Sequence, residues 1–382
     1  YLGIKIPATK VKKILTGLGF QVAGLNKLFV QVSWWREGDV KYDYDLVEEV
    51  ARIYGYHNLP TVLPATEIPV REKDSRFLWA DKTKDVLVGL GFNEVMSYSL
   101  VSEKMIEKAA FKAGNCLKLS NPLSTDLEYL RPTLIAGILQ TITDNQSRAD
   151  EIKIFELSKV YLKKPSDLPD EQLKLTGAIV GDRISDNMFY KIKGVVELLL
   201  KKWGILGFEM ELVDSKCPIW EGGQAVNLLV NHKTKRNNTL NQAKIYIGQF
   251  GVVSNLLLEN FSVDAAVGMF DFEFEEIVKI AILVKSFTPL PEFPAIVRDL
   301  AIVVDEKLAW ADVEKFVRDF DKLIKNVEYL SVYSDGKLAG KKSLAFRVEF
   351  RSDERTLASK EVDEVMKKLV AGLKKEFGAE LR

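Results

Sequence analysis

Four carboxylates stand close together in the segment 34–60, and they are the strongest candidates for chemistry in this chain. Asp39 precedes a run of apolar residues with helical spacing, and Asp45, Glu48 and Glu49 lie within that run at i, i+3 and i+4. This spacing places the last three on one side of a helix, and Asp39 could close the cluster from an extended turn. Because like charges this close repel one another, a cationic partner is expected nearby.

Two interpretations of this cluster remain open. Asp45 and Glu48 have the spacing of a capping box, and acidic residues in a first helical turn are favoured by the helix dipole. Local physics alone favours this first interpretation. The second interpretation is a metal site. Hard oxygen ligands suit Mg²⁺, and Ca²⁺ is less easily excluded as the bound ion than transition metals are. Four carboxylates exceed the charge of one divalent ion, so a structural or inter-subunit ion, or a partner's Lys or Arg, fits as well as a catalytic metal.

The composition sets limits on what the chain can be. Its 382 residues, 47% apolar and 28% charged, are typical of an ordinary soluble chain with two or three domains. Lys plus Arg equals Asp plus Glu, with 54 each, so nucleic-acid binding must depend on local patches. Cys116 and Cys217 lack companions at zinc spacing, which indicates reduced thiols in a cytosolic protein. No apolar run approaches the length of a membrane span, so no membrane partner is expected.

The pattern of residues 1–67 predicts a small α+β unit. We expect a strand at 2–6, a helix at 7–18, strands at 20–22 and 29–33, and then the acidic helix. This order is typical of a winged-helix-like module. Such modules often bind DNA, but the last helix is acidic where a recognition helix would be basic, so no DNA partner is expected. Pro60, Pro64 and Pro69 predict a linker.

The pattern of residues 68–286 predicts a larger, mostly antiparallel sheet with helices. The elements expected are a helix at 75–89, a strand at 95–102, an amphipathic helix at 133–144, strands at 151–162 and 173–181, a helix at 190–203 and further strands through 274. Phosphate-binding loops of the Walker or dinucleotide type are absent from the sequence. Arg131 falls in a turn-to-helix segment and not on a strand from which it could contact an α-phosphate. In addition, no glycine-rich strand ends in an Arg that could hold ATP. This unit therefore has no sequence signature of an ATP site.

The pattern of residues 287–382 predicts a ferredoxin-like domain. The expected order is a strand at 296–304, a helix at 310–321, strands at 327–333 and 343–351, a helix at 359–377 and a short strand at 379–382. In the strand at 343–351 two sets of residues alternate, Leu344, Phe346, Val348 and Phe350 with Ala345, Arg347, Glu349 and Arg351. Helices that cover one face of the sheet would leave the second set open to solvent.

Basic residues gather in the same region of the sequence. The candidates for RNA contact are Arg298, Lys341, Lys342, Arg347, Arg351 and Arg355. A solvated sheet face and an RNA-binding face both remain open, since sheets with basic side chains commonly receive single-stranded RNA.

Three groups of motifs resemble the beta subunit of bacterial-type phenylalanyl-tRNA synthetase, in that family's order. The run D-V-x4-D-L-V-E-E-V-A-R-I-Y-G-Y-x-N-L-P at 39–60 is similar to the B-five domain. NPLS-x5-LRPTL at 121–134, IFELSKVY at 154–161 and FYKIKGVVELLL at 189–200 are similar to the class II synthetase-like core. FPAIVRDLAIVVD at 293–305, KSLAFRVEFRSDERTL at 342–357 and the terminal GAELR resemble the ferredoxin-fold anticodon-binding domain.

The resemblance implies a multidomain α+β fold. Its parts would be a B-five domain at 1–67, a catalytically inactive class II synthetase-like core at 68–286 and a ferredoxin-like anticodon-binding domain at 287–382. In the family, the acids that match Asp39, Asp45, Glu48 and Glu49 bind Mg²⁺ at the contact with the alpha subunit. The chain would be the non-catalytic part of a cytoplasmic α2β2 ligase. In that ligase, the alpha subunit uses ATP to join phenylalanine to tRNA(Phe).

The chain starts at Tyr1 without Met, and we therefore expect it to be the C-terminal part of a longer polypeptide. The family's N-terminal tRNA-binding and editing domains are not in this sequence, so no editing activity is expected of it. The alternative is a non-enzymatic RNA-binding or scaffold protein built from the same modules. Co-expression with an alpha subunit separates the two hypotheses.

Overall fold

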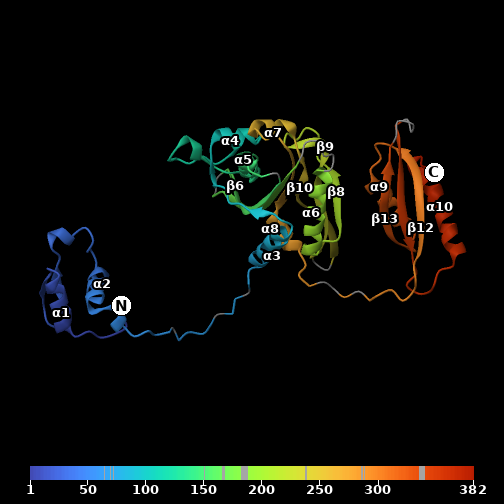
Figure 1. Ribbon diagram of the computed structural model, residues 1–382. Coiled ribbons are helices and arrows are strands. Elements are labelled where there is room, and N and C mark those ends of the chain that lie inside the picture. Colours follow the sequence, from blue (N-terminus) through green and yellow to red (C-terminus); the bar gives the residue numbers. More distant parts are fainter. Residues whose placement is uncertain are drawn as a thin grey trace. The chain divides into compact units, whose positions relative to one another are not determined.

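The computed structural model describes residues 1–63, 65–68, 70–71, 73–149, 151–165, 168–181, 188–236, 239–284, 287, 289–334 and 340–382, and for 232–243 it describes the backbone alone. Two of the three linker prolines, Pro64 and Pro69, lie outside these ranges. The chain divides into two compact units, Tyr1–Leu78 and Trp79–Arg382. The described part of the second unit contains a seven-stranded sheet, a four-stranded sheet and a small two-stranded sheet, and several of their strands are labelled in Figure 1.

The first unit is a small α+β module. Its elements are α1 (Ala8–Gly17), β1 (Gln21–Ala23), β2 (Phe29–Gln31), the 3₁₀ turn η1 (Trp34–Arg36), α2 (Asp43–Tyr54) and the 3₁₀ turn η2 (Tyr56–Asn58). Leu15, Phe20 and Val50 are buried between the two helices and the hairpin. α2 ends at Gly55, whose φ of 96° is a conformation that glycine adopts without strain.

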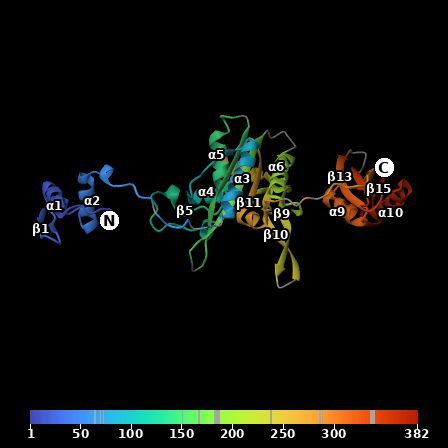
Figure 2. The same ribbon diagram turned by 90° about the horizontal axis from the view of Figure 1, so that it is seen from below.

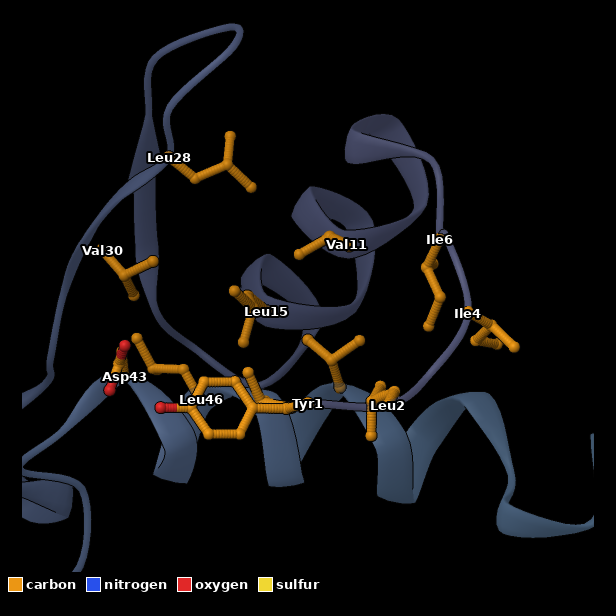
Figure 3. A pocket seen from close by; sticks show the side chains of 12 residues that line it. Tyr1, Leu2, Ile4, Ile6, Val11, Leu15, Leu28, Val30, Asp43 and Leu46 are labelled. Atoms are coloured by element: carbon orange, nitrogen blue, oxygen red, sulfur yellow. The ribbon is translucent and has the colours of Figure 1, made fainter. Parts of the chain in front are cut away.

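The expected strand at 2–6 is not formed. Gly3 has a φ of 71°, which interrupts the extended backbone that a strand needs. Leu2, Ile4 and Ile6 of this segment instead line a cavity of about 400 Å³, together with residues of α1, β2 and α2 (Figure 3). Its lining is mostly apolar, with the carboxylate of Asp43 at one side. The cavity is therefore unsuited to a metal ion or a phosphate group.

The second unit opens with the predicted core. Its elements are α3 (Ser75–Gly89), β3 (Asn93–Glu94), β4 (Leu100–Val101), α4 (Glu103–Lys108), the 3₁₀ turns η3 (Ala113–Asn115) and η4 (Thr125–Leu127), β5 (Tyr129–Leu130), α5 (Ile135–Asn145), β6 (Ile152–Leu162), β7 (Asp170–Gly181), α6 (Met188–Trp203), β8 (Phe208–Leu212), β9 (Trp220–Arg236), β10 (Thr239–Val253), α7 (Asn255–Phe261), β11 (Ala266–Glu273) and α8 (Phe274–Ile280). Seven strands form one sheet in the order β3-β6-β7-β11-β10-β9-β8. Among the described strand pairs of this sheet, only β3–β6 is parallel, so the prediction of a mostly antiparallel sheet is confirmed.

Helices pack on both faces of this sheet. α3, α6 and α8 contribute to one buried cluster, with Trp203, Phe155 and Phe270 among its members, and α5 and α7 contribute to the other. β9 and β10 continue past their neighbours as a two-stranded hairpin (Figure 2). The strand expected at 95–102 is reduced to β4, because its backbone makes scattered contacts, such as Val95 N–H to Phe155 O, instead of a continuous ladder.

The last sheet has the ferredoxin-like order that the sequence predicts. Its elements are β12 (Ile296–Asp305), α9 (Trp310–Phe320), β13 (Ile324–Tyr333), β14 (Lys341–Phe350), α10 (Ser359–Phe377) and β15 (Glu380–Leu381), and the strand order is β13-β14-β12-β15. α9 and α10 cover one face (Figure 1). Phe346, Val348 and Phe350 are buried beneath them, whereas Arg347 is exposed on the opposite face. The predicted alternation of the two faces is confirmed.

Candidate functional sites: the acidic cluster and the basic sheet

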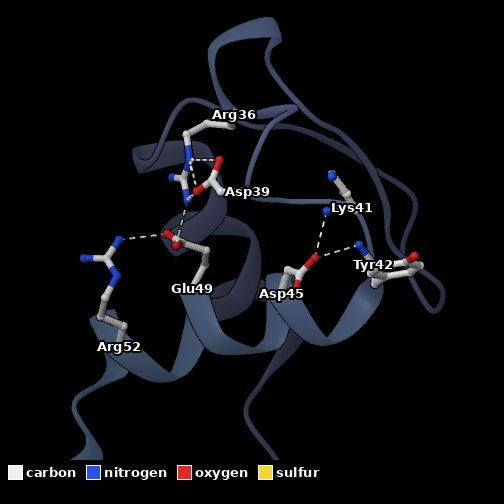
Figure 4. A network of polar contacts seen from close by, with 7 residues as sticks. All are labelled: Arg36, Asp39, Lys41, Tyr42, Asp45, Glu49 and Arg52. Atoms are coloured by element: carbon white, nitrogen blue, oxygen red, sulfur yellow. Dashed lines mark hydrogen bonds and ion pairs between the residues drawn. The ribbon is translucent and has the colours of Figure 1, made fainter. Parts of the chain in front are cut away.

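The start of α2 determines the role of Asp45. The helix begins at Asp43, so Asp45 is its third residue and its carboxylate reaches back toward the N-terminus. Its Oδ2 accepts hydrogen bonds from the backbone N–H groups of Lys41 (2.7 Å) and Tyr42 (2.8 Å) (Figure 4). Asp45 therefore caps the helix from the third position. The prediction that Asp45 and Glu48 form a capping box, with Asp45 as its first residue, is therefore wrong, because Asp45 is the third residue of the helix.

Arg36 lies at the centre of the remaining acidic residues. Its Nη2 donates to Asp39 Oδ2 at 2.7 Å and to Glu49 Oε1 at 2.9 Å, and its Nε donates to Asp39 Oδ2 at 2.9 Å (Figure 4). Arg52 donates to the other oxygen of Glu49 at 2.7 Å. Glu49 is only 9% exposed. The hydrogen bonds from Arg36 hold the pKa values of Asp39 and Glu49 below their usual range.

The structure thus brings Asp39 and Glu49 together around Arg36, while Asp45 is bound to the backbone and Glu48 is exposed to solvent. Among the described residues, no group of three or more His, Cys, Asp or Glu side chains is placed to hold a metal ion. Arranged in this way, the four carboxylates do not fit a divalent ion. The sequence pattern did not identify Arg36 as the cationic partner, although its position three residues before Asp39 was a usable signal.

Arg131 is buried in the core, and polar groups surround it. Its Nη1 donates to Glu156 Oε1 at 2.7 Å and to Ser97 Oγ at 3.0 Å, and its Nε donates to the Lys159 carbonyl at 2.9 Å. The Arg131 side chain is 5% exposed and that of Glu156 is 1% exposed. These internal contacts occupy the guanidinium, so it is not available to a ligand.

Lys174, on the inner strand β7 of the seven-stranded sheet, is also paired with carboxylates. Its Nζ lies 3.2 Å from Asp271 Oδ2 and 2.7 Å from Glu273 Oε1. Burial lowers the pKa of Lys174, but the charges of Asp271 and Glu273 outweigh that effect and hold the pKa above its usual value. A cavity of about 430 Å³ nearby is lined by Glu273, Glu275 and Glu276 among others. Its electrostatic character is unfavourable for a polyphosphate.

The basic residues proposed for RNA contact do not gather in one place. Arg347 pairs with Asp299 on the open face of the sheet, at 2.7 and 3.0 Å. Four others also have acidic partners: Arg298 with Asp363, Lys341 with Glu380, Arg351 with Glu349 and Asp353, and Arg355 with Glu361. For Lys342 no acidic partner is found within the described ranges. These pairs leave little unbalanced positive charge at the positions that the sequence singles out.

One corner of the open sheet face carries a further cation that the sequence pattern did not single out. Arg382 lies with its guanidinium 5.3 Å from the centre of the Tyr333 ring, and its Nη1 donates to Ser343 Oγ at 3.5 Å. The Arg382 backbone N–H donates to the Ala301 carbonyl at 3.0 Å, which anchors it to β12. Tyr333 is 49% exposed and stands opposite Ser343 in the β13–β14 register. In the described part of the chain, no carboxylate pairs with Arg382.

Comparison with known protein families agrees with these three modules. Residues 59–274, more than half of the chain, match the model described as the phenylalanyl tRNA synthetase beta chain CLM domain. The chain belongs to this family. Residues 1–56 match the tRNA synthetase B5 domain, and residues 291–382 match the ferredoxin-fold anticodon binding domain. The acidic cluster therefore lies in the B5 domain, and the Tyr333–Arg382 corner lies in the anticodon-binding domain.

Curated relatives of this phenylalanyl-tRNA synthetase beta chain homologue support the same assignment. The phenylalanine–tRNA ligase beta subunit of Syntrophotalea carbinolica is 31% identical over 100% of this chain and 48% of its own length. That of Clostridium tetani is 30% identical over 100% of this chain and 47% of its own. The chain thus spans about half the length of these relatives.

Among solved structures, that of pyrrolysyl-tRNA synthetase from Desulfitobacterium hafniense aligns with 54% of this chain and 68% of its own, with 16% identity and a TM-score of 0.43. Among the helices described in this member of the beta chain family, none combines the length and apolar character needed to span a bilayer.

Proposed function

We propose that this chain is a non-catalytic portion of the beta subunit of phenylalanine–tRNA ligase. It supports the ATP-dependent attachment of phenylalanine to tRNA(Phe) by the alpha subunit, and it contacts the tRNA. The observation that carries this proposal is the occurrence of the B5, beta chain and anticodon-binding modules in one chain and in this order.

The internal pairing of the core cations supports a non-catalytic role. Formation of an aminoacyl adenylate requires groups that align a carboxylate with the α-phosphate and neutralise the developing negative charge. Arg131 and Lys174 carry charges suited to this task, but both are paired with carboxylates of the core itself. The acid-lined cavity next to Lys174 disfavours a triphosphate further. ATP and its Mg²⁺ then belong to the alpha subunit.

Phenylalanine-dependent exchange of pyrophosphate into ATP tests this division of labour. The purified chain alone is expected to give no exchange above buffer, because Arg131 and Lys174 are already neutralised by core carboxylates. Co-expression with an alpha subunit is expected to give a stable complex of α2β2 composition that carries out exchange. Robust exchange by the chain alone, free of contaminating synthetase, would overturn the non-catalytic assignment. Failure to associate with any alpha subunit, combined with retained tRNA binding, would favour an RNA-binding scaffold.

For the tRNA contact, we propose the open sheet face with the Tyr333–Arg382 corner as its centre. A half-exposed aromatic ring beside a guanidinium, which has no carboxylate partner among the described residues, offers a stacking surface and a positive charge to an unpaired base. Tyr333→Ala should weaken binding of tRNA(Phe) by about 1–3 kcal/mol, the usual effect of losing one stacked base. Tyr329→Ala is the matched control, because Tyr329 packs against Trp310 near the helix-covered face. Equal losses in both variants would place the contact elsewhere.

The remaining assignments of the proposal follow from the holoenzyme. We propose a cytoplasmic location for the chain, together with the alpha subunit that would carry out aminoacylation. Arg298, Lys341, Lys342, Arg347, Arg351 and Arg355 stay predictions as tRNA contacts. The Mg²⁺ ion at Asp39, Asp45, Glu48 and Glu49 also stays a prediction, and it would require Arg36 to move away from Asp39 and Glu49.

A further inference from the structure

The B5 module contains its own positive charge at the place where the sequence pattern suggests a metal ion. The guanidinium of Arg36 touches Asp39 through two nitrogens, with Nε at 2.9 Å and Nη2 at 2.7 Å from Oδ2. The same Nη2 lies 2.9 Å from Glu49 Oε1. One guanidinium thus bridges two carboxylates that are ten residues apart in sequence, in the planar fork geometry for which arginine is suited.

The position of Arg36 is fixed by the fold around it. Its backbone N–H donates to Ser33 O at 2.8 Å, and its carbonyl accepts from the N–H of Val40 at 2.9 Å, so η1 and the turn after it hold both ends of the residue. The guanidinium carbon lies 5.6 Å from the ring of Phe20, a fully buried member of the module's core. Arg36 is therefore held in place by backbone hydrogen bonds and by a cation–π contact, in addition to its acidic partners.

Burial makes this charge necessary. Glu49 is almost completely buried, and a buried carboxylate is strongly unfavourable unless a cation or several donors compensate for it. Arg36 and Arg52 supply that compensation, one at each oxygen of Glu49. Asp45 is already satisfied by two backbone N–H groups, so Glu48 is the one carboxylate of the four for which no partner is found in the described part of the chain. Asp39 is also exposed but is paired with Arg36, and a single carboxylate without a partner is too few for the oxygen-rich coordination that Mg²⁺ or Ca²⁺ requires.

We propose that Arg36 is the resident counterion of this cluster, in the place that a divalent ion would otherwise take. The chain neutralises Asp39 and Glu49 without a metal, and its B5 module folds in the same way with or without Mg²⁺. An ion can reach these oxygens only if Arg36 moves away from them. Because both oxygens contact the same Nη2, removal of the guanidinium leaves two carboxylates close enough to attract a cation in its place.

The test measures amide hydrogen exchange in α2 of the full chain, with excess Mg²⁺ and with chelator, because this readout reports on the B5 module separately from the other domains. The wild type is expected to show the same protection in both conditions. Arg36→Met keeps the aliphatic stem but removes the charge, so protection should fall in chelator and recover in Mg²⁺. At a Mg²⁺ concentration of about 100 times its Kd, binding would shift the equilibrium of this variant toward the folded state by a factor of about 100.

Two further variants keep the test decisive. Arg52→Met is the matched control, because Arg52 contacts the other oxygen of Glu49 and its loss leaves Arg36 in place, so no dependence on Mg²⁺ should appear. Arg36→Lys retains a positive charge if the Met variant fails to fold, and it should show a smaller Mg²⁺ response of the same sign. Protection of wild-type α2 that rises with Mg²⁺, and that loses this rise in Asp39→Asn, would overturn the proposal. Arg36→Met with unchanged protection would overturn it as well.

Discussion

At the scale of single residues, the ionic groups of this chain mostly satisfy one another inside each module. The buried Arg131–Glu156 pair shows this most clearly. Ser97 hydrogen-bonds to both side chains of the pair, and a backbone carbonyl accepts a further hydrogen bond from Arg131. Such a pair adds little stability compared with well-packed apolar residues, but loss of one partner leaves an uncompensated charge in the core. The expected effect of a substitution therefore depends on whether one partner or both are changed.

Arg131→Met should destabilise the chain by about 3–5 kcal/mol, because Glu156 would remain buried without a counterion. Arg131→Met combined with Glu156→Leu should recover a large part of that loss. Denaturant unfolding of the two single variants and the double variant measures the coupling between the residues. Additive effects in this cycle would show that the pair does not act as a unit.

The pH dependence of the B5 module should follow Glu49. Hydrogen bonds from Arg36 hold its folded pKa below the unfolded value of about 4.3. The stabilisation is therefore fully present above that unfolded value, and it is lost as the pH falls through the folded pKa. Protection factors of α2 amides, corrected for intrinsic exchange, should fall in this acidic range for the wild type. Glu49→Gln should flatten the dependence, and an unchanged acid profile in that variant would assign the effect to another group.

At the scale of elements, the open face of the ferredoxin-like sheet is nearly balanced in charge. Arg347 on β14 faces Asp299 on β12 and Glu328 on β13, so acidic residues flank it on both sides. Phosphate would have to compete with Asp299 for this guanidinium, whose hydrogen bonds also hold the pKa of Asp299 low. Arg298 on the same strand as Asp299 pairs with Asp363 of α10, on the side that the helices cover.

Asp299→Asn should strengthen tRNA binding, because it frees Arg347 and removes a negative charge from the open face. The slope of log affinity against log salt should become steeper by about 0.7 if one further phosphate of a single strand is neutralised. Asp363→Asn is the matched control: it frees Arg298 on the helix-covered side and should leave the slope unchanged. Salt titrations of tRNA(Phe) binding measure both variants. A steeper slope only in the control would place the RNA on the helix side.

Substitution by Ala should change the stability in opposite directions at two glycines of the synthetase-like domain, Gly248 and Gly194. A Cβ at Gly248, where the β9–β10 register shifts, would collide with the Asp271 carbonyl and the Phe272 backbone, and its φ of 141° disfavours other residues. Gly194 lies on α6, and a Cβ there would meet open space among the described residues. Gly248→Ala should therefore destabilise by about 1–3 kcal/mol, and Gly194→Ala should stabilise by about 1 kcal/mol. Denaturant midpoints that shift in the same direction would contradict the different backbone constraints assigned to the two positions.

The sequence predicted elements well wherever local pattern and tertiary packing agree. The α10 helix was expected at 359–377 and is observed there, and the strand with Phe346 and Phe350 has the predicted buried face. The strand predicted at 2–6 is not formed, because the apolar residues of this segment do not reveal the positive φ of Gly3 among them.

Ion-pair partners were the least predictable part of the candidate sites. Arg298 finds Asp363 at a separation of 65 residues, and only the folded topology determines that choice. The same holds for Arg347 and Asp299, which are 48 residues apart. The sequence identified cations that could contact RNA, but it could not show that carboxylates already accompany most of them.

At the scale of the whole molecule, each module has its own buried core. The clusters around Leu15 in the first unit, around Phe155 and Met269 on the two faces of the large sheet, and around Phe346 in the last domain are separate. Lys plus Arg and Asp plus Glu are equal in number over the chain, so no net charge drives its association with RNA. Recognition must then come from a local surface of one module.

Deletion of residues 1–62 should leave the folding of the rest of the chain intact, since the described cores of the large sheet and of the ferredoxin-like sheet contain no residue from that segment. The denaturant midpoint of the shortened chain should match that of the full chain for the core, and its tRNA binding should be retained. Circular dichroism during denaturation and filter binding measure the two properties. Aggregation or a large loss of midpoint would show that the B5 module stabilises the others.

The Arg131–Glu156 pair has a consequence for how the core responds to heat. Charged groups lose hydration free energy as the temperature rises, so the penalty for keeping them out of water becomes smaller. Apolar packing around Phe155 and Leu139 has no comparable gain over the same interval, since its contribution per unit area levels off. The polar centre of this core should thus hold together relatively better in a warm cell than in a cold one. Substitution of the pair by apolar residues would be tolerated most readily at low temperature.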